Sequence, residues 1–228
     1  MNYNIISTGS DGNAVIINNF ALIDCGVTFR ALFKFVKQIK IVLLTHRHAD
    51  HFNFTTIHRL AAERPTLRFA CGSWLVQDLV ACGVSKANID ILTPGIVYDY
   101  NAFKVSPVTL YHDVQNCGYR LFFDKERAIY ITDTATVQGI SAKDYDLYLV
   151  EANYSESEIQ QRIKSKEALG QYVYEYRVLK THLSKEECDA WLLENMSDSS
   201  EYVYLHQHRF KEGDENFYPY RGAGESLL

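Results

Sequence analysis

The sequence has no surplus of positive charge, no long apolar run and no pair of cysteines in a C-x-x-C spacing. Its 23 lysines and arginines stand against 28 aspartates and glutamates, which gives a formal net charge of −5. A broad basic face for a nucleic-acid duplex is therefore not expected, although a small phosphate ester is not excluded. No segment approaches the roughly 18 apolar residues of a membrane span, and the N-terminus shows no signal peptide. We therefore expect a cytoplasmic protein with no membrane partner.

The five cysteines are odd in number and scattered along the chain. They are Cys25, Cys71, Cys82, Cys117 and Cys188. Such usage is typical of a reducing compartment, where cysteines act as small hydrophobic residues. Cys117 lies near enough to His112 to line a site there, but a core role is favoured. Internal repeats and low-complexity tracts are also absent, and we expect one domain over residues 1–210 with a polar tail over 211–228.

What the sequence does contain is a concentration of metal-binding side chains directly after the apolar run 41–44. His46, His48, Asp50 and His51 fall within six positions. A buried strand that opens into a polar loop delivers such side chains together at its carboxyl end. His46 and His48 are two apart and project to one side of an extended segment, so they can share one ion. Asp50 and His51 follow where the chain must turn, and are better placed for a second ion beside the first. Zinc suits these ligands, with manganese, iron or nickel as alternatives.

Strands and helices alternate in the first part of the chain, and a period of two replaces the helical spacing over residues 96–131. Strands are expected over 5–7, 15–17, 21–23, 41–44, 67–70, 97–98, 102–110, 118–123, 127–131, 147–151 and 202–205. Helices are expected over 29–39, 53–64, 74–82, 155–169 and 172–179, and from the capping box at Ser184 to about 194. His58 lies inside the second helix and is interpreted as a surface or packing residue.

The pattern H-x-H-x-D-H behind an apolar strand resembles the signature of the metallo-β-lactamase-fold hydrolases. Other segments are similar to the YycJ/WalJ-like branch of this superfamily, which is related to tRNase Z and to PhnP-type phosphodiesterases. These segments are Ser7–Asn13, His112-Asp113, Thr132–Thr134 and Thr181–Lys185. The resemblance extends from Ile5 to His208. It implies an α/β fold, a four-layered αββα sandwich with a dinuclear metal site at one edge of its two sheets.

The resemblance also supplies the remaining metal ligands, which follow predicted strands. His112 and Asp133 come in the order in which the family has a further histidine and a bridging carboxylate. The last predicted strand delivers His206, with His208 as the alternative; the family match favours His206 because it comes first after the strand. The expected assignment is His46, His48 and His112 on one ion, Asp50, His51 and His206 on the other, and Asp133 bridging both.

Three residues are expected to take part in catalysis or to support it. Asp24 ends a predicted strand in an Asp-x-Gly segment. The family uses such an acid to orient a ligand histidine through its other ring nitrogen, although an isolated aspartate there would be read as a helix cap. Asp50 is assigned a catalytic role in addition to its ligand role. His182 corresponds to the histidine of the branch's G-H-L-S-N segment, which protonates the leaving alkoxide. Glu151 either faces the site or caps the following helix.

The chain departs from the branch in several places. Thr181, Lys185 and Ala135 replace a glycine, an asparagine and a glycine of the branch's motifs. These differences bear on substrate geometry more than on metal binding. No insertion resembling the long tRNA-binding arm of tRNase Z is found, and the chain is short for the branch, which predicts trimmed substrate loops.

These features predict a hydrolase in which two divalent ions about 3.5–4 Å apart hold a shared hydroxide as nucleophile. The branch-specific segments favour a phosphodiesterase or nuclease, with a nucleic-acid end or a nucleotide as substrate and His182 as general acid. A phosphodiesterase for cyclic or signalling nucleotides is the first alternative, favoured by the acidic charge and the absent arm. A thioesterase, a lactonase and a metal-binding protein without catalytic activity are further alternatives. The oligomeric state stays open, a homodimer included.

Overall fold

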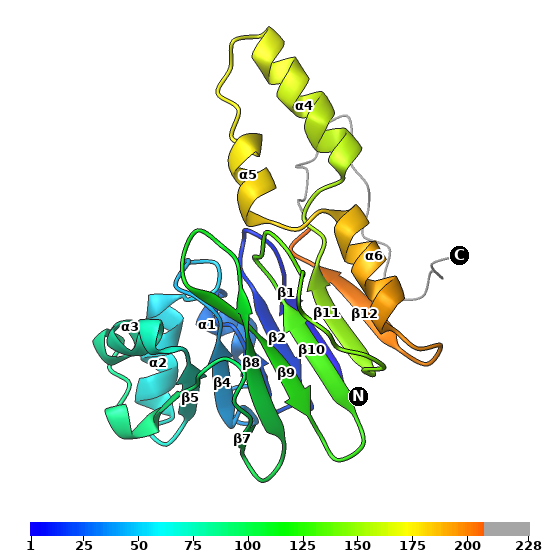
Figure 1. Cartoon of the computed structure of the whole chain (residues 1–228). Helices are drawn as coiled ribbons and strands as arrows, with labels where there is room; N and C mark the ends of the chain where they lie inside the picture. Colours follow the sequence, from blue (N-terminus) through cyan, green and yellow to red (C-terminus); the bar gives the residue numbers. More distant parts are fainter. Residues whose placement is uncertain (208–228) are drawn as a thin grey trace.

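The computed structural model describes residues 1–207 of the chain (Figure 1). The strands are β1 (Tyr3–Ser7), β2 (Ala14–Ile17), β3 (Ala21–Ile23), β4 (Ile41–Leu44), β5 (Arg68–Cys71), β6 (Ile89–Ile91), β7 (Tyr98–Asp99), β8 (Lys104–Leu110), β9 (Asn116–Phe122), β10 (Arg127–Ile131), β11 (Leu147–Glu151) and β12 (Glu201–Leu205). The helices are α1 (Phe29–Leu32), α2 (Phe54–Glu63), α3 (Val76–Ala81), α4 (Glu156–Ala168), α5 (Glu175–Thr181) and α6 (Lys185–Asn195). His208, the alternative ligand, and the tail predicted over 211–228 lie outside the described residues.

The strands form two mixed sheets of six strands each. The first has the order β1-β2-β3-β4-β5-β6 and the second the order β12-β11-β10-β9-β8-β7. Strands β3 to β6 run parallel, as do β10 to β12, whereas β1 to β3 and β7 to β10 are antiparallel. The antiparallel run β7 to β10 occupies the part of the sequence where the apolar period changes to two, because hairpin-connected strands alternate their side chains between two faces.

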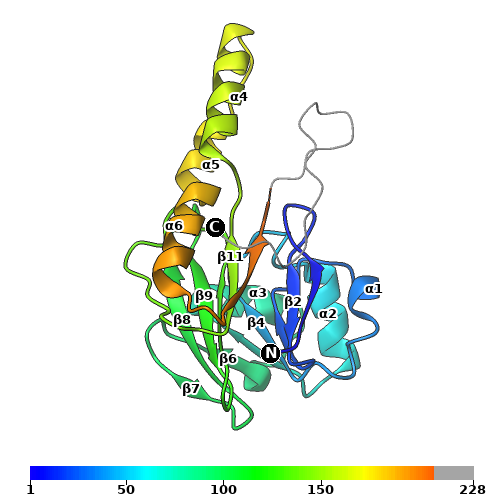
Figure 2. The same ribbon diagram turned by 90° about the vertical axis from the view of Figure 1, so that its right-hand side faces the viewer.

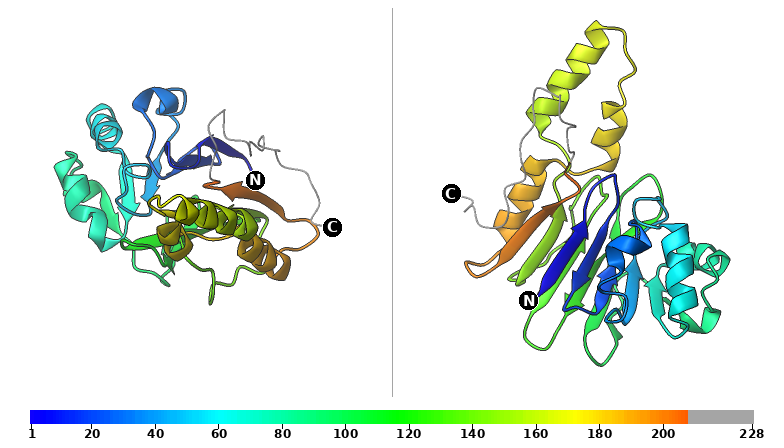
Figure 3. Two further views of the ribbon diagram at one scale, coloured as in Figure 1. Left: turned by 90° about the horizontal axis from the view of Figure 1, so that it is seen from above. Right: turned by 180° about the vertical axis from the view of Figure 1, so that it is seen from behind.

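The strand that precedes the metal-binding motif is buried on both of its faces, which explains its unbroken apolar sequence. Val42 and Leu44 of β4 pack among the helices α1 to α3, whereas Leu43 packs against the second sheet. On the far side of the second sheet, Tyr148 of β11 packs against Trp191 of α6. The layers therefore follow the order helix, sheet, sheet, helix (Figure 3). This confirms the αββα fold class predicted from the sequence.

Two helices leave this sandwich and form an arm, defined here as residues 156–181. Figures 1 and 2 show α4 and α5 projecting together from the body. Ile159 and Ile163 are the buried residues of α4, and Leu169 near the tip is exposed. Lys166 joins the two helices through an ion pair with Glu175 (2.6 Å). The sequence predicted both helices but not their projection, and no residue of either helix belongs to the core clusters that the sandwich forms within residues 1–207.

The first predicted helix is much shorter than its sequence pattern suggests. Helix α1 ends at Leu32, and the residues up to Gln38 form turns. Val36 and Ile39 are buried nevertheless, so the turns keep the apolar spacing that predicted a helix up to residue 39. Among residues 1–207, no helix combines the length and the apolar character needed to cross a bilayer.

Gly26 lets the loop after β3 touch the loop that carries the metal-binding motif. A Cβ atom at this position would lie 1.7 Å from the carbonyl oxygen of Asp50, which is backbone and cannot rotate away. We expect Gly26→Ala to lower the free energy of unfolding by about 3 kcal/mol or more, measured by urea denaturation. Gly139→Ala is the control: its Cβ would meet nothing within 4 Å, so only the strain of a left-handed backbone, about 1–2 kcal/mol, applies. Equal losses in the two variants would contradict this account.

Candidate metal centre

The ends of four strands and one interhelical connection bring the candidate residues together. The loop after β4 carries His46, His48, Asp50 and His51, while His112, Asp133 and His206 follow β8, β10 and β12, and His182 joins α5 to α6. Ligand atoms of these residues form groups in which all atoms lie within 4.8 Å of one another. The structure therefore gathers at one place all seven ligands expected from the sequence, together with His182.

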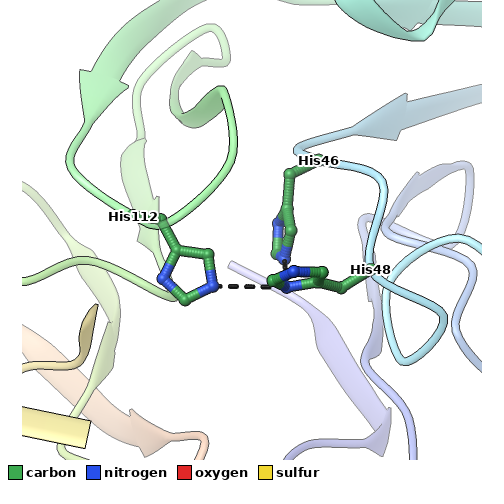
Figure 4. Close-up of side chains that lie close together, drawn as sticks. All are labelled: His46, His48 and His112. Carbon is green, nitrogen blue, oxygen red and sulfur yellow. Dashed lines mark hydrogen bonds between the residues drawn. The ribbon is translucent and has the colours of Figure 1, made fainter. Parts of the chain in front are cut away.

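Three histidine rings form the first cluster (Figure 4). Nε2 of His46 lies 3.2 Å from Nδ1 of His48, and Nε2 of His112 lies 3.3 Å from the same nitrogen. His46 is fully buried and His48 is half-buried. These are the three histidines that the sequence analysis grouped on one ion.

A hydrogen bond fixes the tautomer of His112, and a carboxylate lies beside the outward nitrogen of His48. Nδ1 of His112 donates to the carbonyl oxygen of Thr181 (2.8 Å), because a carbonyl can only accept. Nε2 of His48 lies 3.3 Å from Oδ1 of Asp113. In the neutral rings, Nε2 of His112 and Nδ1 of His48 therefore carry lone pairs that face each other.

The ring of His46 is fixed through Thr45 and Asp24. The hydroxyl of Thr45 donates to the carboxylate of Asp24 (2.9 Å) and lies 3.0 Å from Nδ1 of His46, from which it accepts. Nε2 of His46 therefore also presents a lone pair to the cluster. Three lone pairs thus converge without a donor between them, an arrangement that a cation stabilises and that neutral rings alone do not.

The second cluster is built around His51, whose side chain is fully buried. Nδ1 of this ring donates to Oδ2 of Asp24 (2.7 Å). Its Nε2 faces Oδ2 of Asp133 at 2.7 Å and Oδ2 of Asp50 at 3.4 Å. His206 approaches the same carboxylates, with Nε2 3.4 Å from Oδ2 of Asp50 and 3.6 Å from Oδ1 of Asp133. The residues assigned to the second ion therefore also lie together.

Asp133 lies between the two clusters. Its carboxylate shares a group with His46 and His51, and its Oδ1 is 4.0 Å from Nε2 of His112. The backbone of Asp133 is left-handed (φ 55°), and the side chain of Asn116 donates to its carbonyl oxygen at 2.7 Å. A position between two groups of ligands is the one that a bridging carboxylate requires.

Burial and neighbouring charges together shift the pKa values of the residues in this centre. Burial lowers the pKa of His46 to about 2, and the neighbouring His51 acts in the same direction. Burial also opposes a charge on His51, but Asp133 and Asp24 outweigh it and hold the His51 pKa well above the usual value. For Asp133, burial raises the pKa, yet His51 and His206 outweigh it, so the pKa lies well below the usual range. Protonated His51 thus balances the buried carboxylates, and a bound cation would displace its proton.

The donor set fits divalent metal ions. Imidazole nitrogens and carboxylate oxygens are the ligands that zinc and related ions prefer. The rings of His46, His51 and His112 are each held by an acceptor at Nδ1, which is the usual support for a ligand histidine. The buried histidine and aspartate clusters are therefore consistent with a metal site.

Glu151 faces this centre. The sequence had left open whether Glu151 faces the site or caps the following helix. Its Oε1 lies 2.6 Å from Nδ1 of His182, and its Oε2 accepts from the backbone amides of Thr134 (2.9 Å) and Leu183 (3.3 Å). Glu151 is fully buried. Burial lowers the pKa of His182, but the charge and the hydrogen bond of Glu151 outweigh it, so this pKa is raised.

Sequence reasoning missed several residues that hold the centre in place. Nδ2 of Asn13 donates to the carbonyl oxygen of Asp50 (3.2 Å), and Nδ2 of Asn153 donates to the carbonyl oxygen of His206 (2.9 Å). The turn-rich segment around Asn13 was a usable signal, whereas nothing in the sequence marks Asn153. A packing role was favoured for His58 and Cys117. His58 contacts the carbonyl oxygen of Cys82 (2.9 Å), and Cys117 is buried in the core between the sheets.

Comparison with known proteins agrees with this geometry. A family model described as "Beta-lactamase superfamily domain" matches residues 19–197. The chain belongs to the beta-lactamase superfamily. No curated protein matches the chain significantly.

Solved structures of other proteins share the fold at low sequence identity. The metallo-beta-lactamase fold protein YhfI from Bacillus subtilis has a TM-score of 0.69 and 17% identity, with 93% of this chain and 88% of that chain covered. The short form of human tRNase Z has a TM-score of 0.67 and 14% identity, with 91% and 93% covered. Zn²⁺-bound PqqB from Methylobacterium extorquens has a TM-score of 0.64 and 12% identity, with 91% and 89% covered. At these identities the likeness concerns the fold.

For this member of the beta-lactamase superfamily we expect two zinc ions per chain, measured by inductively coupled plasma mass spectrometry after dialysis. His112→Ala and His206→Ala each remove one ring from a different cluster, so each variant should retain about one ion. His58→Ala, outside both clusters, should retain two. A wild-type protein that binds no zinc, or equal zinc loss in His58→Ala, would contradict the assignment.

Proposed function

We propose that this protein is a dinuclear metal-dependent phosphodiesterase. The proposed ligands are His46, His48 and His112 for one ion and Asp50, His51 and His206 for the other, with Asp133 in contact with both. Zinc is proposed as the ion because imidazole and carboxylate ligands suit it and because PqqB of the same fold was solved with Zn²⁺. The proposal depends most on one observation, the hydrogen-bonded pair of Glu151 and His182 beside the two groups of ligands (2.6 Å).

Bound divalent ions would supply Lewis acidity toward the phosphoryl oxygens and lower the pKa of water in the site. The side chains supply positioning and protons. Because Nδ1 of His182 is bound to Glu151, Nε2 is the nitrogen that can donate a proton to the leaving alkoxide. The raised pKa of His182 increases its protonated fraction near neutral pH, which is the state that a general acid requires.

Two aspartates take further roles in this proposal. Asp24 contacts Thr45 and His51 and lies behind the ligands, so it is a positioning residue. The side chain of Asp50 is 23% exposed, and its Oδ2 lies 3.4 Å from the rings of both His51 and His206. Asp50 is therefore able to accept a hydrogen bond from the attacking water in addition to its proposed ligand role.

A phosphodiester is preferred over a carboxylic ester because an alkoxide leaves phosphorus poorly unless a proton is delivered to it. The tRNase Z structure shows that this fold also occurs in an RNase. The substrate is proposed to be a nucleic-acid end or a nucleotide. A small cyclic or signalling nucleotide remains the second candidate, supported by the net charge of −5. The absence of an insertion resembling the long tRNA-binding arm of tRNase Z also supports that candidate.

The general-acid role of His182 predicts a dependence on the leaving group. With a dinucleotide, which leaves as a sugar alkoxide, His182→Ala should lower kcat by about 10²–10⁴-fold. With bis-p-nitrophenyl phosphate the loss should be under about tenfold, because nitrophenolate departs without protonation. Initial rates with added zinc or manganese measure both values. His58→Ala is the matched control and should leave both rates unchanged; equal losses of His182→Ala on the two substrates would refute the role.

The pair of Glu151 and His182 also predicts a pH dependence. The carboxylate raises the pKa of His182, and only the protonated ring can act as acid, so kcat should fall as pH rises through that pKa. Glu151→Gln removes the negative charge and should shift this alkaline limb to lower pH. The pH profile of kcat with a dinucleotide measures the shift. An alkaline limb at the same pH in wild type and variant would show that Glu151 does not tune this group.

A further inference from the structure

The second helix of the arm returns to the first histidine cluster and contacts His112 and the residue that follows it, Asp113. Thr181, the last residue of α5, accepts the hydrogen bond of His112 Nδ1 at its carbonyl oxygen (2.8 Å). One turn earlier on the same helix, the guanidinium of Arg177 donates to Oδ2 of Asp113. Asp113 directly follows His112 in the sequence. The arm is therefore attached to the loop after β8 by two independent bonds.

Asp113 continues this connection to a second histidine. Its other oxygen, Oδ1, lies 3.3 Å from Nε2 of His48 and 3.2 Å from Nε2 of His112. Because Nδ1 of His48 faces His46 at 3.2 Å, Nε2 is the outward nitrogen of that ring. A carboxylate beside the outward nitrogen favours a proton there, which makes the inward nitrogen a better ligand.

We propose that α5 positions the ligands of the first metal site, through a relay from Arg177 to Asp113 to His48 and through the carbonyl group of Thr181 to His112. This inference rests on the ligand roles proposed above for His48 and His112. The second cluster has its own supports in the body of the protein, since Asp24 accepts from the ring of His51 and Asn153 donates to the backbone carbonyl oxygen of His206. Loss of the relay should therefore affect one ion and spare the other.

The relay acts on geometry and contributes little to stability. The side chain of Arg177 is 68% exposed, and ion pairs at such exposure contribute little to folding because solvent screens them. The loss of a residue that orients a metal ligand lowers metal affinity by about 10–100-fold. Changes at Arg177 should therefore weaken one ion strongly while leaving the metal-free protein almost as stable as before.

The test is a zinc titration of the full chain against a chromophoric chelator, with Arg177→Met and Asp113→Asn as variants. Each should bind one of the two ions about 10–100-fold more weakly than wild type, with the other ion unaffected. Arg177→Lys should recover part of the loss. Lys180→Met is the matched control: it removes the same charge from an exposed position on α5, and Lys180 makes no ion pair within residues 1–207. Cobalt(II) spectra then report whether the coordination of one ion has changed.

The outcomes separate this inference from the proposed function. A wild-type protein without zinc affinity overturns both. A wild type that binds two ions, with Arg177→Met and Asp113→Asn binding both as tightly as Lys180→Met, overturns the relay and leaves the proposed function intact. Thermal unfolding of the metal-free variants shows whether each is folded, and Asp113→Asn decides the question if Arg177→Met is not.

Discussion

The centre depends on one buried carboxylate, that of Asp24. It is fully buried and accepts hydrogen bonds from the amide and hydroxyl of Thr45, from Nδ1 of His51 and from the hydroxyl of Tyr130. A buried charge needs such a complete set of donors. By accepting these hydrogen bonds, Asp24 fixes the start of the metal-binding loop and turns the ring of His51 toward Asp133. Through Thr45, it also turns the ring of His46 toward the first cluster.

The backbone contributes a second constraint at the strand ends. Asp24 and His206 directly follow β3 and β12, and Asp133 is the second residue after β10. All three have left-handed φ angles, 58° for Asp24, 55° for Asp133 and 50° for His206. L-residues rarely adopt this region, and its cost is tolerated mainly at functional sites. The turn ends each strand abruptly and directs the side chain over the edge of its sheet. Strands from both sheets thereby contribute to one centre, and the lone pairs and carboxylates gathered there are consistent with a metal site.

The sequence predicted the features that depend on local patterns. The apolar run 41–44 and the spacing of the following histidines indicated a buried strand that opens into a metal-binding loop, and the change of period indicated the antiparallel half of the second sheet. The sequence did not predict the contact of Arg177 with Asp113, 64 residues apart, or that of Asn153 with His206, 53 residues apart. Contacts between such distant segments leave no local pattern. Glu151 stayed ambiguous because an acid at a strand end suits a helix cap and a site residue equally.

The central claim is that these side chains converge on a pair of divalent ions. Anomalous diffraction at the zinc absorption edge, from crystals grown with zinc, measures this directly. The account predicts two peaks, one among His46, His48 and His112 and one among Asp50, His51 and His206, with the carboxylate of Asp133 between them. Zinc peaks confined to surface residues, with none inside either cluster, would contradict it.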